Sequence, residues 1–182
     1  GDVHYWDVWH GQKPITEYRK TCFRFISEFG FQSFPERRTI ESFTLPGDRN
    51  VFSRIMEKHQ KNLTTNSRIL YHISELFQYP KDFDSVLYAS QLVQAEAVKC
   101  GVEHWRRDRG RCMGAIYWQL NDCWPAVSWS GIDSFGRWKA LHYFAVRFFA
   151  PVLLSVLDTD KKAEFFVTNE TRDKVCGVME WK

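Results

Sequence analysis

The spacing of apolar residues along the chain predicts an α/β fold for residues 1–150. Aromatic and polar residues alternate through 22–27, which is typical of a short buried strand, and residues 113–118 predict a second strand. Between and after these strands, apolar residues recur every three or four positions, which predicts helices over 48–59, 70–77, 88–105 and 138–149. The order strand, helices, strand, helix is the α/β pattern.

Two details of the helices follow from local chemistry. Asp48 comes after a Leu-Pro-Gly turn and is expected to be the N-cap of the first helix. In the longest helix, the buried apolar face is expected to run from Tyr88 to Trp105. Basic residues in 106–111 are then expected to close this helix, because positive charge is favourable at a helix C-terminus.

The pattern changes after Pro151 to that of successive β-strands. Residues 152–157 and 163–167 are predicted to be strands joined by a polar turn. The segment 151–182 is too short to close a β-sandwich. We therefore expect it to be the incomplete start of a second, all-β domain, which follows a first domain over residues 1–150.

Composition narrows the class of protein. The chain of 182 residues has 15 Phe, 8 Trp and 7 Tyr, an aromatic content that must fill a core or line a groove. Its net charge of +3 does not indicate a nucleic-acid-binding protein, and the most apolar stretch, 141–157, carries charged residues and a proline, so no membrane span is expected.

The five cysteines have no C-x-x-C spacing, so neither a disulfide framework nor a zinc site is indicated. Unpaired cysteines favour a reducing compartment such as the cytoplasm. Two Asn-x-Thr sequons, at Asn62 and Asn169, carry no weight on this point without independent signs of secretion.

Candidate chemistry gathers where the predicted strands end. Functional side chains of α/β barrels lie at the C-terminal ends of strands. Glu28 ends the first strand, residues 118–122 follow the second, and the polar-aromatic stretch 2–11 is expected to follow a strand lying upstream. Tryptophan rings stack on sugar faces, and glycosidic cleavage needs carboxylates, so this set predicts carbohydrate chemistry.

The same segments resemble a known family. Residues 1–11, 25–35 and 114–125, with 59–62 and 136–143 between and after them, are similar to consecutive signatures of the β-mannosidases of glycoside hydrolase family 2. The resemblance implies the C-terminal part of a (β/α)8 TIM barrel, namely strands seven and eight with their helices, followed by the first strands of an immunoglobulin-like β-sandwich. It also implies exo-hydrolysis of terminal β-D-mannose with retention, without a metal or other cofactor.

The resemblance assigns catalytic roles as well. Glu28, in a Ser-Glu-Phe-Gly motif, matches the family's nucleophile. The acid/base glutamate belongs to an Asn-Glu pair earlier in the family's sequence, so it is expected in the remainder of the parent polypeptide. The Asn169-Glu170 pair follows the nucleophile and is expected to be a surface turn.

Substrate-binding roles are assigned in the same way. Trp118 matches a tryptophan that stacks on the sugar, and Trp6 and His10 match pocket positions, with His10 expected to hydrogen-bond Glu28. Asp122 and Trp124 are candidates for contact with a β-mannoside or manno-oligosaccharide, although bracing of the loop after the second strand is an equal alternative for both.

Two other functions stay open at this stage. The enzyme could prefer another sugar, as a related β-galactosidase, β-glucuronidase or exo-β-glucosaminidase. Alternatively, the tryptophans could hold glycan in a non-catalytic binding module. The sequence leaves the natural glycan and the oligomeric state open.

Overall fold

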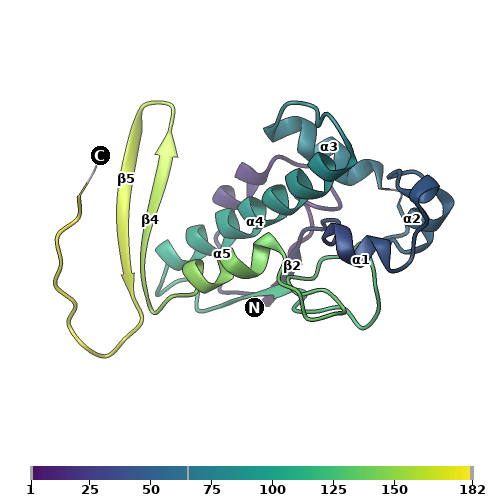
Figure 1. Ribbon diagram of the computed structural model, residues 1–182. Coiled ribbons are helices and arrows are strands. Elements are labelled where there is room, and N and C mark those ends of the chain that lie inside the picture. The colour runs from purple at the N-terminus through teal and green to yellow at the C-terminus, as the bar shows by residue number, and fades with distance from the viewer. Residues whose placement is uncertain (1, 65, 181–182) are drawn as a thin grey trace.

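The computed structural model describes residues 2–64 and 66–180 and contains two separate sheets. A parallel sheet is formed by β1 (Asp2–His4), β2 (Phe25–Gly30) and β3 (Ala115–Trp118), in that order. An antiparallel hairpin is formed by β4 (Val152–Thr159) and β5 (Lys162–Asn169). Figure 1 shows the hairpin at one side of a body made of the helices and the parallel sheet.

The parallel sheet corrects one expectation. Residues 2–4 are themselves a strand rather than part of a loop after an upstream strand, so the chain carries three parallel strands where two were predicted. The reason is that β1 is very short, and its residues alternate between exposed and half-buried over three positions only. Such a strand is defined by pairing with β2, which brings Val3 opposite Ile26, and not by a local pattern.

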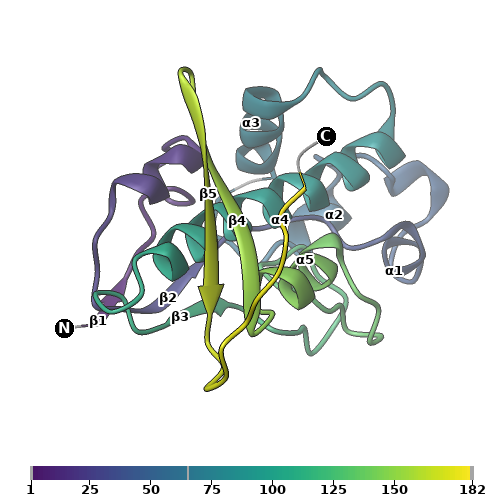
Figure 2. The same cartoon turned by 90° about the vertical axis from the view of Figure 1, so that its left-hand side faces the viewer.

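The helices include α4 (Phe83–Arg107), the longest, which covers the sheet, and α5 (Ala140–Phe148), which packs against α4. Figure 2 shows α4 running across the molecule, with the three parallel strands below it. The shorter elements are η1 (Ile15–Lys20), α1 (Arg37–Glu41), η2 (Pro46–Asp48), α2 (Arg54–Lys58) and α3 (Ser67–Leu76).

Two of the helix details were wrong. Ser53, not Asp48, caps α2 by accepting a hydrogen bond from the Met56 backbone N–H at 3.3 Å, while Asp48 ends the separate turn η2. Tyr88 is exposed, because the buried face of α4 also includes the polar side chains Ser90 and Gln94. Both of these side chains hydrogen-bond the chain that follows β2, so an apolar pattern alone misplaces the face.

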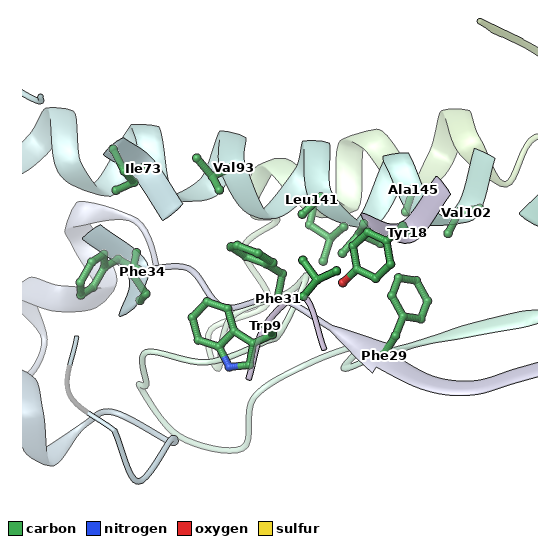
Figure 3. Close-up of a cluster of buried hydrophobic side chains, with 14 of the residues drawn as sticks. Trp9, Tyr18, Phe29, Phe31, Phe34, Ile73, Val93, Val102, Leu141 and Ala145 are labelled. Carbon is green, nitrogen blue, oxygen red and sulfur yellow. The ribbon is translucent and has the colours of Figure 1, made fainter. Parts of the chain in front are cut away.

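Aromatic side chains fill the space between α4 and the sheet. Figure 3 shows Trp9, Tyr18, Phe29 and Phe31 under the helices, and all four are buried. Phe29, from β2, meets the Trp105 ring of α4 edge-on, with 4.7 Å between ring centroids. The middle strand is therefore anchored by its inward side chains, which leaves Glu28 on the opposite face of the pleat.

The hairpin is held to the helical body by ion pairs. Asp158 accepts from Arg19 at 2.8 Å, and Glu170 lies 3.3 Å from Arg106 and 2.9 Å from Arg109. Glu170 follows β5 and is exposed, as expected for a surface turn, and the Arg106 guanidinium also donates to the carbonyls at the end of α5. The strands β4 and β5 confirm the predicted pair of strands after Pro151.

In the described part of the chain, no helix has the length and apolar character needed to cross a membrane. All five cysteines are free thiols in the structure.

Candidate active site

The Glu28 carboxylate lies near the C-terminal end of β2, at the rim of the parallel sheet. A register shift between Val3 and His4 places His4, rather than Tyr5, directly opposite Glu28 in the strand pairing. The Trp6 indole N–H donates to Glu28 Oε1 at 2.9 Å, and His4 Nδ1 lies 3.6 Å from the same oxygen. The hydrogen bond from Trp6 holds the glutamate side chain in place. Its exposure of 26% leaves it open to solvent.

This geometry suits a nucleophile. Trp6 donates to Oε1 and His4 lies on the same side, and a carboxylate held through one oxygen can present the other to an electrophilic carbon. In the described residues, no three His, Cys, Asp or Glu side chains gather in a group that could hold a metal ion.

Trp118 lies at the same rim, one strand away. It ends β3, pairs in register with Gly30 of β2, and is 46% exposed. A Cβ at position 30 would overlap the Trp118 carbonyl oxygen and lie 3.1 Å from the Trp6 ring. The glycine therefore permits the close approach that brings Trp6, Glu28 and Trp118 to one edge of the sheet.

His10 does not occupy its predicted place beside Glu28. The chain turns after β1, with the His10 N–H donating to the Trp6 carbonyl at 2.7 Å, and this turn carries the imidazole past Trp6. Its Nδ1 lies 3.2 Å from an Arg68 guanidinium nitrogen, and its ring centroid is 5.0 Å from that of Trp6. Burial, and then the charge of Arg68, lower the pKa of His10. The imidazole next to Glu28 belongs to His4, which sequence reasoning passed over.

Asp122 lies beneath the surface, with 7% exposure. Its Oδ2 accepts hydrogen bonds from the hydroxyls of Ser128 at 2.9 Å and Ser130 at 2.6 Å. The structure therefore favours the loop-bracing alternative over contact with substrate.

Trp124 is half-exposed but already engaged. Its ring stacks on His59, with 4.5 Å between centroids, and the Lys61 ammonium lies 4.2 Å from the ring centroid. His59 stacks in turn on Phe43 at 3.8 Å. Contact between Trp124 and substrate stays a prediction.

Comparison with known proteins shows which proteins this chain is similar to. The chain is 40% identical over 166 residues to the β-mannosidase of Capra hircus and 38% identical over 161 residues to β-mannosidase B of Aspergillus niger, matches that cover 84% and 86% of this chain. A β-D-mannosidase from Dictyoglomus thermophilum superposes with a TM-score of 0.90 at 40% identity over 94% of this chain. The chain is homologous to a segment of the β-mannosidases. The resemblance predicted from its motifs is thereby confirmed.

The β-mannosidase relatives are much longer than this chain, which spans about a fifth of their length, 19% of each of the two curated proteins and 21% of the solved structure. The exo-chitosanase of Amycolatopsis orientalis also superposes, with a TM-score of 0.67 over 85% of this chain. At 16% identity, that match shows a shared fold only. A search against models of protein families found no match.

Proposed function

We propose that this chain carries the nucleophile of a retaining exo-β-mannosidase, and that the nucleophile is Glu28. One observation carries the assignment: a partly exposed carboxylate, hydrogen-bonded through one oxygen by Trp6 and with His4 Nδ1 3.6 Å from that oxygen, lies at the strand ends beside the exposed Trp118. The β-mannosidase relatives support the glycoside as substrate.

In the proposed reaction, Glu28 attacks the anomeric carbon of a terminal β-mannoside. The glycosidic bond breaks, and its oxygen takes a proton from an acid supplied by the remainder of the parent polypeptide. The same group then removes a proton from water, which attacks the glycosyl-enzyme, releases mannose and regenerates Glu28. Retaining enzymes hold the two carboxyl groups about 5 to 5.5 Å apart.

The fold supports a matching proposal about architecture. The three parallel strands with α4 and α5 would be the closing part of a (β/α)8 barrel, with β1, β2 and β3 as strands six, seven and eight. Residues 151–182 would begin an immunoglobulin-like domain, whose first strands are β4 and β5. Both free edges of the parallel sheet would then pair with strands of the parent polypeptide.

The test uses the full-length parent protein and a set of nitrophenyl glycosides. We expect a preference for the β-mannoside, and loss of several orders of magnitude in kcat for Glu28→Gln, which keeps the shape and removes the nucleophile. Glu75→Gln, on the exposed side of α3, is the matched control and should keep full activity. A 2-fluoro-mannoside that traps the intermediate should label the peptide containing Glu28.

Other outcomes separate the alternatives. The set of glycosides includes a glucosaminide because the fold is shared with an exo-chitosanase. A preference for the glucosaminide would indicate a related glycosidase. Activity that survives Glu28→Gln unchanged would leave the tryptophan-lined rim as a binding surface without catalysis.

A further inference from the structure

Lys139 is a buried lysine that contacts both the chain after β2 and the chain after β3. It directly precedes α5, and its side chain is only 2% exposed. Its Nζ lies 3.3 Å from the Ser33 carbonyl oxygen and 3.3 Å from the Ser128 carbonyl oxygen. An ammonium group in such a position carries a desolvation cost, so a buried lysine calls for a physical explanation.

The ammonium lies against a short segment, residues 128–131, which connects two loops of the rim. On one side, the Ser33 N–H donates to the Ser128 carbonyl at 3.0 Å. On the other side, the Gly131 N–H donates to the Gln119 and Leu120 carbonyls, both at 3.1 Å. Residues 128–131 thus lie between the chain that leaves β2 and the chain that leaves β3.

Lys139 holds this segment at both ends. Its Nζ contacts the Ser128 carbonyl, and its backbone N–H donates to the Gly131 carbonyl at 2.9 Å. The Asp122 carboxylate fixes the same segment through the hydroxyls of Ser128 and Ser130. The segment is therefore fixed by one buried lysine and one buried aspartate.

Residues 128–131 also contact Trp6, the residue that hydrogen-bonds the proposed nucleophile. The Trp129 ring meets the Trp6 ring edge-on, with 6.1 Å between centroids, and Trp6 donates to Glu28. Gln119, which accepts from Gly131, directly follows Trp118 in the chain. A shift of the segment would move both Trp6 and Trp118 relative to Glu28.

We propose that Lys139, as the ammonium, is a positioning residue that holds residues 128–131 between the chain that leaves β2 after Glu28 and the chain that leaves β3 after Trp118, and so sets the geometry of the site around Glu28. This inference rests on the function proposed above. Lys139 does not touch the substrate and acts through Trp6 and Trp118.

The charge of Lys139, and with it the contacts that hold residues 128–131, depends on pH. Burial lowers the pKa of Lys139 to about 7, against the opposing attraction of Asp122 and Asp133. These two carboxylates are the charged groups facing the ammonium, and Asp133 is also paired with Arg137 at 3.8 Å. As pH rises through about 7, the folded protein loses this proton, and the contacts to both carbonyls lose their charge.

Stability and activity should therefore respond in opposite directions. Between the folded pKa near 7 and the ordinary lysine value of 10.5, the unfolded chain binds more protons, so the free energy of unfolding rises with pH. Activity falls as pH rises through about 7, because the ammonium that holds the segment is lost. A purely structural lysine would affect stability alone.

The experiment compares the full-length wild type with Lys139→Met across pH 5.5 to 8.5, using nitrophenyl β-mannoside. We expect the ratio of their kcat/KM values to be about tenfold or more at the acidic end, as for loss of a buried charged hydrogen bond, and to approach one at the alkaline end. Lys139→Arg, which stays charged, should keep part of the activity without this alkaline loss. Lys81→Met, whose side chain is 85% exposed, is the control and should give a ratio of one throughout.

If Lys139→Met does not fold, a measurement on the wild type without substrate still tests the proposal. Tryptophan fluorescence of the full-length protein should change with a midpoint near pH 7, since Trp129 lies on the locked segment and contacts Trp6. A pH-independent activity ratio, or a flat fluorescence titration, would overturn the proposal. If the parent hydrolyses no β-mannoside, the proposed function fails, and the fluorescence titration still decides the role of Lys139.

Discussion

At the scale of single residues, the site depends on which side chain reaches the Glu28 carboxylate. Trp6 reaches it through the indole N–H, at 2.9 Å, and His4 through Nδ1, at 3.6 Å. His10, although close in sequence, is turned toward Arg68 at 3.2 Å. The carboxylate is thus oriented mainly by a neutral donor, with a titratable imidazole at longer range.

Replacement of Trp6 by Phe tests this orientation. The substitution keeps an aromatic ring and removes the N–H donor, so the carboxylate loses a hydrogen bond of the charged type, which contributes about 1.5–3 kcal/mol. We expect kcat/KM of the parent enzyme for nitrophenyl β-mannoside to fall about ten- to a hundredfold. Trp138→Phe, at a 47% exposed tryptophan before α5, is the matched control. Equal activity of the two variants would argue against a role for the indole N–H.

At the scale of elements, the decisive feature is the close pairing of β2 and β3. Gly30 and Trp118 are paired in register. A side chain at position 30 would not fit between the Trp118 backbone and the Trp6 ring. Phe29 anchors β2 to α4 from the other face. The two strand ends that carry Glu28 and Trp118 are held at a fixed separation for this reason.

Gly30→Ala should disturb this separation. The added methyl group would overlap the Trp118 carbonyl oxygen, and overpacking of this kind costs about 1–3 kcal/mol of stability. We expect a lower melting temperature and a loss of about a hundredfold in kcat/KM of the parent, because small displacements of catalytic groups are expensive. Gly47→Ala provides the comparison, since no atom lies within 4 Å of its added Cβ. Wild-type activity in Gly30→Ala would contradict the fixed spacing.

At the scale of the whole molecule, the described surface carries apolar side chains along the free edge of β3 and on α5. Met113, Ile116, Tyr143 and Val146 are each more than half exposed. Apolar side chains exposed to this extent are candidates for burial at an interface. In the architecture proposed above, further strands and helices of the parent polypeptide cover it.

The isolated 182-residue chain is accordingly expected to have no mannosidase activity and to aggregate. In residues 2–64 and 66–180, the outer edges of β1 and β3 are unpaired, and the proposed acid/base residue is expected in another part of the parent. Light scattering at micromolar concentration and a nitrophenyl β-mannoside assay, with the full-length enzyme in parallel, would check both points. Turnover by the isolated chain would show that the assignment of the catalytic pair is wrong.

The sequence by itself determined the succession of strand, helices, strand and helix before Pro151, the change to strands joined by a turn after it, and the resemblance to the β-mannosidases. These features are local: they depend on apolar periodicity, turn residues and motifs whose residues are adjacent in the chain. Glu28 could be proposed from sequence for the same reason, since a carboxylate at the end of an aromatic strand stands out without knowledge of its neighbours.

Only the tertiary structure decided what surrounds Glu28. β1 is a strand because it pairs with β2, and a register shift in that pairing puts His4 opposite the carboxylate. The turn after Trp6 moves His10 away, and loop packing buries Asp122 and Lys139. Register, burial and loop packing are set by contacts between residues far apart in the chain, which local periodicity does not encode.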